Sequence, residues 1–237
     1  MSSRHTLVCL PPLDDPQQWA EAIDDAVQPY PDDIYTWSAF ERYDSHLVTR
    51  PDAQPVPGPL VQSPRAHQLS PLRCSGSRRD LLDFDTMRAE RAGQASRLYS
   101  AWEAATATMP PANPLSSFRH RHPQDSYRAR QNFLAQPQLQ VLSDLGVPAA
   151  QDRRGMAAAL VTLDHDAFVE RARQRAVPGD LLLTDDGALH INPAFIRPDA
   201  DEDAESASAR YLALANGYLD TLPADYLVFS LNVRLAG

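Results

Sequence analysis

The sequence of 237 residues contains no lysine, so all 22 of its basic residues are arginine. This absence excludes a Schiff-base lysine, a lysine general base and the phosphate-binding lysine of a P-loop. Because alanine, arginine, proline and aspartate are abundant, a GC-rich genome with few lysine codons explains the absence better than selection against lysine modification. Arginine supplies positive charge in its place, with a planar group that binds anions differently.

Cysteine and long apolar runs are also scarce. Cys9 and Cys74 are too few for a disulfide framework, so we expect reduced thiols. No stretch approaches the roughly 20 apolar residues of a membrane span. The apolar run that follows His5 ends at Pro11 and is too short for a signal peptide. We therefore expect a cytoplasmic protein that is not associated with a membrane.

Net positive charge is missing as well. The formal net charge of −9 makes direct non-specific binding to nucleic acid improbable, because phosphate contacts need clustered positive charge. It leaves room for a local arginine patch. The hydrophobic fraction of 43% is enough for a core, and the length suits one large or two small domains.

The order of patterns predicts an α+β fold with ferredoxin-like β-α-β-β-α-β elements and a central all-helical segment. We divide the chain into an N-terminal β-α-β-β segment, a Pro-rich connector, a helical segment and a C-terminal α+β segment, and these could pack as one unit. Their bounds are 1–50, 51–73, 74–149 and 150–237.

The N-terminal segment predicts strands at 5–10, 34–37 and 46–49. A helix follows the first strand, with Asp15 as its cap, Pro16 at its first position and Gln18 completing a capping box.

The central segment predicts three helices. The first is capped by Asp83 or Asp85 and runs to Met109. The second covers 125–134 and the third runs from Pro137 to Gly146. The expected inward residues are Ala95, Leu98, Trp102, Ala105 and Met109 in the first helix, and Tyr127, Phe133 and Leu134 in the second.

The C-terminal segment opens with 156–163 (MAAALVTL), which predicts a strand although its alanines also allow a helix. Asp164 caps the next helix. A hairpin covers 180–191, and the acidic run 199–205 leads into another helix. A strand at 226–235 ends the pattern. The apolar residues expected on the last helix are Tyr211, Leu214, Ala215, Tyr218 and Leu222.

Two segments are candidates for binding. The first is an aromatic and polar cluster that could line a pocket or an interface, or could simply pack a strand and its loop. Its members are Trp37, Phe40, Arg42, Tyr43 and His46. The second is 74–79 (CSGSRR), in which Gly76 allows an unusual backbone conformation and Arg78 and Arg79 could hold an anion. A simple turn is the alternative, and no histidine can be assigned as a base for Cys74.

Three further clusters have simpler explanations. His120 and His122 with Asp125 resemble a metal motif, but a surface turn explains them better. The run Asp164-His165-Asp166 and the pair Asp83 and Asp85 are better explained as helix caps. We predict no metal and no cofactor.

Three stretches carry a family resemblance: LVCLPP (7–12), IYTWSAFERYDSHL (34–47) and CSGSRRDLLDFDTMR (74–88). They resemble an uncharacterised family of small proteins from high-GC bacteria and their phages. Phe40 and Glu41 stand in place of that family's glycine pair, and Ser45 in place of a later glycine. The resemblance implies no activity.

The sequence therefore predicts a non-catalytic, cytoplasmic interaction or regulatory protein, encoded by a bacterium, a phage or a mobile element, whose partner is another protein. The predicted contact residues are Trp37, Arg42, Tyr43, His46, Cys74, Arg78 and Arg79. The alternative is a small enzyme that acts on an anionic metabolite or nucleotide, with Asp83 or Asp85 as its acid-base group. A third hypothesis is an acidic mimic of nucleic acid, which needs one contiguous acidic face.

Overall fold

The computed structural model describes residues 3–29, 46–53, 73–147, 155–193 and 202–234. The predicted strand at 34–37 and most of the Pro-rich connector lie outside these residues. The chain divides into two compact units. Unit 1 comprises Met1–Arg88, Gln174–Asn192 and Ala209–Gly237, and unit 2 comprises Ala89–Arg173 and Pro193–Ser208.

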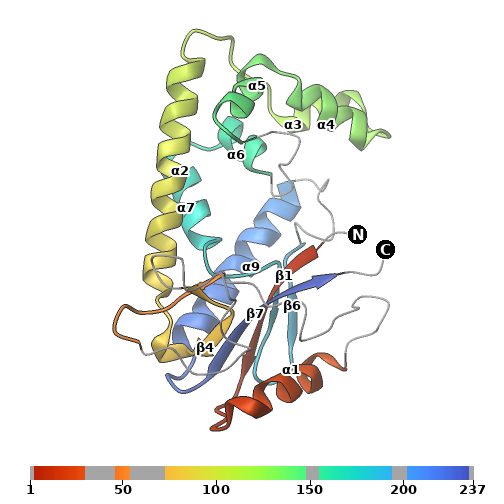
Figure 1. Ribbon diagram of the computed structural model, residues 1–237. Helices are drawn as coiled ribbons and strands as arrows, with labels where there is room; N and C mark the ends of the chain where they lie inside the picture. Colours follow the sequence, from red (N-terminus) through yellow and green to blue (C-terminus); the bar gives the residue numbers. More distant parts are fainter. Residues whose placement is uncertain (1–2, 30–45, 54–72, 148–154, 194–201, 235–237) are drawn as a thin grey trace. The chain divides into compact units, whose positions relative to one another are not determined.

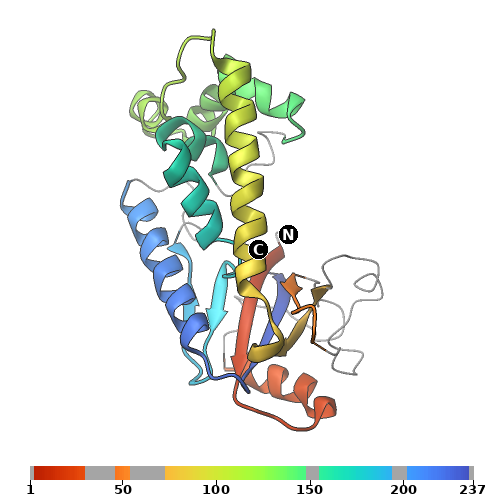
Figure 2. The ribbon, with the colours of Figure 1, turned by 90° about the vertical axis from the view of Figure 1, so that its left-hand side faces the viewer.

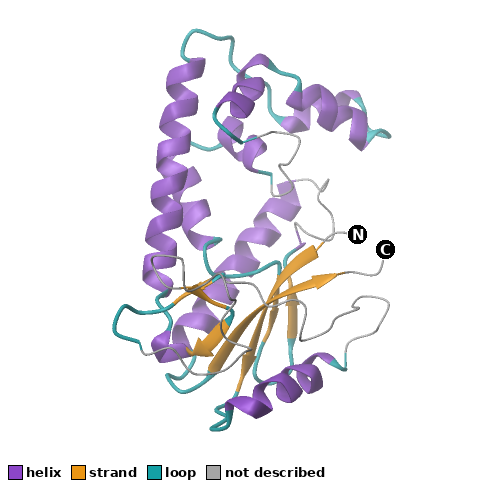
Figure 3. Ribbon diagram, in the orientation of Figure 1, coloured by secondary structure: helices purple, strands orange, loops and turns teal. Residues whose placement is uncertain are grey.

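Unit 1 contains a five-stranded mixed sheet with the order β4-β7-β1-β5-β6 (Figures 1 and 3). The central strand β1 (Ser3–Leu10) is antiparallel to β7 (Leu227–Arg234) and parallel to β5 (Leu181–Leu183). The outer strands are β4 (Gly76–Arg78) and β6 (Leu189–Ile191). Two short strands, β2 (Leu47–Val48) and β3 (Arg73–Cys74), form a separate antiparallel pair.

The predicted α+β class is confirmed. The ferredoxin-like arrangement is not confirmed, because the described sheet has five strands and a parallel β1–β5 pair at its centre. The predicted hairpin is present as β5 and β6, with Gly187 in its turn at a φ of +82°. The strand predicted at 226–235 is β7.

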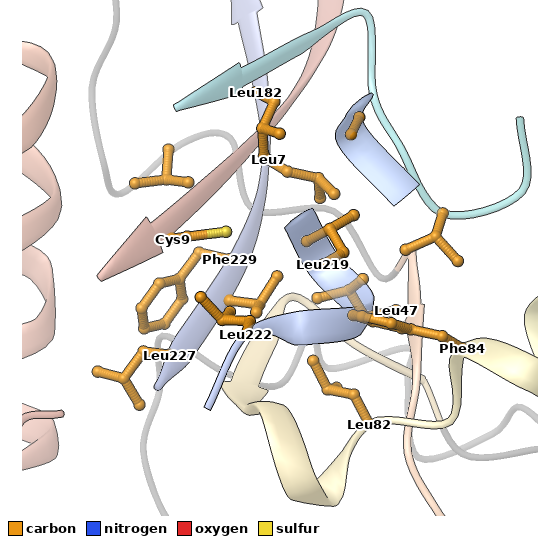
Figure 4. Packing of buried hydrophobic residues seen from close by; sticks show 14 of the residues in the cluster. Leu7, Cys9, Leu47, Leu82, Phe84, Leu182, Leu219, Leu222, Leu227 and Phe229 are labelled. Carbon is orange, nitrogen blue, oxygen red and sulfur yellow. The ribbon is translucent and has the colours of Figure 1, made fainter. Parts of the chain in front are cut away.

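Two helices cover opposite faces of the sheet. Trp19 of α1 (Trp19–Val27) packs edge-on against Phe229, with ring centroids 5.5 Å apart. Phe229 is the register partner of Val8, whereas the next residue, Cys9, faces Tyr218 of α9 (Glu202–Thr221). Because successive strand residues face opposite sides, α1 and α9 lie on different faces (Figure 2). Figure 4 shows the apolar side chains of this core.

The first helix begins one turn later than the capping pattern predicts. The carboxylate of Asp15 accepts a hydrogen bond from the Gln17 amide, so the predicted cap is confirmed. The residues Pro16–Gln18 nevertheless form a 3₁₀ turn, η1, and the α-helix starts at Trp19. Trp19 and Ile23 are four residues apart and share the buried face.

All described elements between β4 and β5 are helical. After the 3₁₀ turn η4 (Arg79–Leu81) come six helices, which end at Gln174. They are α2 (Phe84–Thr106), α3 (Leu115–Arg121), α4 (Ser126–Leu134), α5 (Pro137–Asp144), α6 (Met156–Thr162) and α7 (His165–Gln174).

The helix ends follow local signals. Asp83, Asp125 and Asp164 each accept a backbone hydrogen bond from the third residue after them. The predicted caps Asp83 and Asp164 are therefore confirmed, and Asp125 is a further cap at the start of the helix predicted at 125–134. Gly146 ends α5 with a φ of +75°, and the amides of Gly146 and Val147 bond back to Ser143 and Leu142. This is the Schellman pattern of a helix C-terminus.

The strand predicted at 156–163 is wrong, because this segment forms helix α6. Ala157, Ala159 and Leu160 are buried, and alanine is the best helix former. The structure also adds α3, which turns the predicted loop around His120 into a helix.

Some predicted inward residues face outward. Tyr127 and Leu214 are exposed on α4 and α9, while Phe133, Leu134 and Ala215 are buried as predicted. On α2, Ala105 is exposed and its neighbour Thr106 is buried. Helical spacing fixes which residues share a face, but it leaves the centre of the buried face uncertain by about one residue.

A buried hydroxyl in β1 lacks a hydrogen bond among the described residues. The hydroxyl of Thr6 has no such partner, whereas the buried Thr106 hydroxyl donates to the Trp102 carbonyl at 2.8 Å. We expect Thr6→Val to stabilise the protein by about 1 kcal/mol and Thr106→Val to destabilise it by a similar amount, since an unpaired buried hydroxyl is unfavourable. Urea denaturation checks this, and an equal loss of stability in both variants would contradict it.

Candidate functional site

The predicted contact residues are only partly described. Trp37, Arg42 and Tyr43 lie outside the described residues. His46, Cys74, Arg78 and Arg79 all belong to unit 1, but each makes a different local contact. The structure therefore does not join these four into one constellation.

His46 pairs with a second histidine that the sequence did not suggest. Its ring centroid lies 4.1 Å from that of His5, and its Nε2 is 3.3 Å from the Val177 carbonyl oxygen. His5 is buried, and its Nε2 lies 2.8 Å from the Ser230 hydroxyl. These contacts join β1, β7 and the segment before β5. His5 and His46 are far apart in the chain, which explains why no local pattern indicated their contact.

Both thiols are unsuited to nucleophilic chemistry. Burial raises the pKa of Cys74 to about 12, and the Gly76 backbone hydrogen bond offsets only part of that rise. Burial also raises the pKa of Cys9 far above its usual range. A cysteine nucleophile reacts as the thiolate, so neither thiol is activated at neutral pH.

The 74–79 segment is not a simple turn. Cys74 ends β3, Gly76–Arg78 form β4, and Arg79 opens η4. The prediction that Gly76 adopts an unusual backbone is also wrong, since its φ is not positive. Gly76 is needed for close packing, because a Cβ there would overlap the Phe229 ring and lie 2.9 Å from the Val228 carbonyl oxygen.

Arg78 and Asp83 are engaged in local structure. Arg78 forms a bidentate pair with Asp80, with the shorter N–O distance at 2.6 Å. The Asp83 carboxylate caps α2 and also accepts from the Thr86 hydroxyl. Asp85 is different, since its side chain is 94% exposed and lies 3.6 Å from Arg88.

Arg79 belongs to a group that we call the arginine cluster, formed by Arg50, Arg79 and Arg88. The Nε of Arg79 donates to the Leu219 carbonyl at 2.9 Å, and its guanidinium lies 4.2 Å from the Phe84 ring centre. Burial lowers the pKa of Arg79; Asp220 opposes this, and the positive charges of Arg50 and Arg88 lower it further. The three guanidinium groups therefore share one electrostatic environment.

Arg88 anchors this cluster to α9. Its Nη2 donates to Asn216 at 2.9 Å and to Asp220 at 2.8 Å. Neither Arg50 nor Arg88 was predicted, because Arg50 follows β2 and Arg88 lies in α2, and no local motif joins either residue to Arg79. For Arg88, the weak signal was the frequency of arginine in 73–91.

The candidate metal residues serve other roles. His120 lies in α3, Asp125 caps α4, and the Nε2 of His122 is 3.0 Å from the Asn132 side-chain nitrogen. Within the described ranges, no three His, Cys, Asp or Glu side chains form a group that could hold a metal ion.

The residues of the Asp164-His165-Asp166 run also have separate roles. Asp164 caps α7, while His165 lies between Asp166, at 2.9 Å from its Nδ1, and the Ser96 hydroxyl, at 3.0 Å from its Nε2. Asp166 is almost fully exposed. The run therefore combines a cap with a surface contact.

A second candidate surface lies on α3 and α4 of unit 2, which we call the basic helix pair. It carries four arginines, two histidines and one exposed tyrosine. Asp125 is the only acidic residue between Glu103 and Asp144. The charged and aromatic members are Arg119, His120, Arg121, His122, Tyr127, Arg128 and Arg130.

Comparisons with protein-family models, curated proteins and solved structures find no match for this chain. The resemblance carried by 7–12, 34–47 and 74–88 stays a prediction. In the described part of the chain, no helix combines the length and apolar character needed to span a bilayer.

Proposed function

We propose that this protein is a non-catalytic cytoplasmic binding protein whose basic helix pair engages an acidic partner protein. The observation that carries the proposal is the local reversal of charge. The chain as a whole has 22 arginines and 31 acidic residues, yet 115–134 holds four arginines and one aspartate. Oppositely charged surfaces attract and orient their partners.

The one acid in this region does little to neutralise it. Asp125 caps α4 by accepting from the Arg128 amide at 2.8 Å, and no ion pair involves it among the described residues. Arg121 and Arg128 are exposed. Arg121 stacks on Phe118 at 4.3 Å from the ring centre, which fixes its position on α3.

Tyr127 adds a contact of a different kind. It is 72% exposed on α4, although Ala129, Phe133 and Leu134 of the same helix are buried. Tyrosine and arginine are enriched among the residues that contribute most to protein interfaces. An exposed tyrosine that precedes the exposed Arg128 in the chain supports a binding role for the basic helix pair.

An acidic protein suits this surface better than a nucleic acid. A long polyanion would extend past the basic helix pair and meet a chain whose remaining charge is strongly negative. An acidic patch on a protein needs only local complementarity. The two free, buried cysteines are consistent with a reducing compartment.

The contacts of the titratable groups favour binding over catalysis. Asp83, Asp125 and Asp164 are caps, and Arg78 is paired with Asp80. The two thiols are protonated at neutral pH because burial raises their pKa values. The enzyme alternative would have to use Asp85 instead, which is exposed rather than held in a desolvated position.

Charge reversal tests the proposal. We expect Arg128→Glu to weaken capture of an acidic protein from an extract of the source cell by at least about tenfold, because it places like charge against the partner. Arg97→Glu is the control, since Arg97 is also exposed on a helix of unit 2 and its substitution changes the net charge by the same amount. Quantitative mass spectrometry of the captured proteins is the measurement.

Two outcomes would contradict the proposal. The first is equal loss of the captured protein with both variants, which would indicate a net-charge effect. The second is loss after nuclease treatment of the extract, which would identify a nucleic acid as the partner. Weaker capture at higher salt is expected in either case and does not discriminate.

A further inference from the structure

We propose that Arg50 and Arg79 bind the terminal phosphoryl group of a small phosphomonoester. This site lies in unit 1, and it is independent of the proposed function of the basic helix pair. Nothing in the proposal requires catalysis or a covalent step.

The backbone brings these two arginines onto neighbouring segments. The Arg50 amide donates to the Leu81 carbonyl at 2.9 Å, and the Asp83 amide donates to the Val48 carbonyl at 2.9 Å. Thr49 also forms a β-bridge with Leu82. The segment at the end of β2 and the segment that precedes α2 are therefore paired, and Arg79 opens the 3₁₀ turn between β4 and this junction.

Each guanidinium is positioned by the protein through its Nε, and no other described residue engages its two terminal amino groups. The Nε of Arg79 donates to the Leu219 carbonyl at 2.9 Å, and the Nε of Arg50 lies 3.5 Å from the Leu82 carbonyl oxygen. Neither side chain makes another hydrogen bond or ion pair within the described ranges. Phe84 supports the plane of the Arg79 guanidinium.

Two such groups match the shape of a phosphoryl group. The terminal amino groups of one guanidinium can donate in parallel to two oxygens of a phosphate or carboxylate. A phosphomonoester offers three oxygens and a charge of about −1.5 to −2 at neutral pH. It can therefore bridge two arginines, whereas a single carboxylate has only two oxygens and one charge.

The charges around Arg79 favour an added anion. Arg50 and Arg88 both disfavour its charged form, as does burial. Asp220 offsets part of this, but it also accepts a hydrogen bond from Arg88 at 2.8 Å. Asp85 is the other nearby acid and extends into solvent. A dianion between Arg50 and Arg79 would relieve the remaining repulsion.

Arg88 has a supporting role in this site. Its side chain is 13% exposed and is already held by Asn216, Asp220 and Asp85. It keeps Asp220 engaged, so that this carboxylate does not pair with Arg79. We assign ligand contact to Arg50 and Arg79 alone.

Titration calorimetry of the full chain tests the site with three probes: inorganic phosphate, O-phosphoserine and AMP. All titrations are made at one ionic strength, set with chloride. We expect saturable 1:1 binding of at least one probe, weakened at least about tenfold by Arg50→Gln and by Arg79→Gln. Arg78→Gln is the control and should leave the affinity unchanged, because Arg78 is paired with Asp80.

The pattern across probes identifies the source of the phosphoryl group. Preference for O-phosphoserine indicates a phosphorylated side chain and preference for AMP a nucleotide, whereas preference for inorganic phosphate would contradict an ester as the ligand. If Arg79→Gln fails to fold after losing its bond to Leu219, Arg50→Gln decides the question. The absence of saturable binding with all three probes, or an equal loss with Arg78→Gln, would overturn the proposal.

Discussion

Replacing Gly179 with alanine is expected to destabilise the protein by about 3 kcal/mol or more, near the upper end of the range for overpacked cores. A Cβ at this position would lie 2.5 Å from the His5 carbonyl oxygen and 2.9 Å from its carbonyl carbon. Both are backbone atoms of the central strand, so no side chain can move aside to make room.

The same carbonyl anchors the start of the β1–β5 pair. The His5 carbonyl accepts from the Asp180 amide at 2.7 Å, and the Gly179 carbonyl accepts from the Tyr211 hydroxyl at 3.0 Å. A shift of either strand would therefore weaken contacts to β5 and to α9. Gly179 is required because two backbones approach closely here, and its φ is not in the left-handed region.

Gly217→Ala is the matched control. A Cβ at Gly217 would meet nothing within 4 Å, and Gly217 lies inside α9. Because alanine favours the helix over glycine by about 1 kcal/mol, this substitution should stabilise the protein slightly. Circular dichroism in urea gives both values. Equal midpoints for Gly179→Ala and Gly217→Ala would show that the close approach at β1 has no energetic consequence.

Phe229→Ala is the second substitution with a large expected effect, at about 3–5 kcal/mol of lost stability. Phe229 is fully buried, packs against Trp19, and occupies the space that the missing side chain of Gly76 leaves open. Removal of its ring would leave a cavity between α1 and the sheet. Tyr127→Ala is the control, since Tyr127 is exposed and its loss should change stability by no more than about 0.5 kcal/mol.

A double substitution makes this prediction specific. Gly76→Ala alone should destabilise the protein by about 1–3 kcal/mol, because its methyl group overlaps the Phe229 ring. In the Phe229→Ala background the methyl group no longer overlaps a ring, although it still lies close to the Val228 carbonyl oxygen, so the combined loss should be smaller than the sum of the two single losses. Full additivity in a chemical-denaturation cycle would contradict direct packing between these residues.

Tyr127→Ala also connects stability to function. A variant that stays folded but loses the partner would assign Tyr127 to the interface, independently of the charge-reversal test. The phosphomonoester site can fail without affecting this result, because its residues belong to unit 1 and Tyr127 to unit 2. The two proposals are therefore separable by experiment.

Local sequence was sufficient for most helices and for the hairpin. Asp15, Asp83 and Asp164 are caps as predicted, and Gly146 ends α5. These signals work because a cap and its amide lie within three residues of each other. In 156–163 the local signals for a strand and for a helix were balanced, and the predicted strand was wrong. Which of the two forms there depends on which residues are buried, and the tertiary structure decides that.

For the candidate sites, too, local sequence indicated some residues and only the tertiary structure identified the others. The sequence pointed to Arg79 from its neighbours in 74–79, but it joined Arg79 to Arg78, which is instead paired with Asp80. The residues that share the environment of Arg79 are Arg50 and Arg88, placed there by the β2 junction and by α9. The basic helix pair was not predicted, although 115–134 contains four arginines, because the sequence does not show which of them are exposed.

By itself, the sequence determined the absence of lysine chemistry, the α+β composition, the caps at Asp15, Asp83 and Asp164 and the turn at Gly187, all of which depend on residue type or on near neighbours. Tertiary structure alone decided that β1 pairs with both β5 and β7, that Gly179 and Gly76 must remain glycine, and that Arg50 lies near Arg79. These features join segments far apart in the chain, and their energies come from burial and close packing that no local pattern encodes.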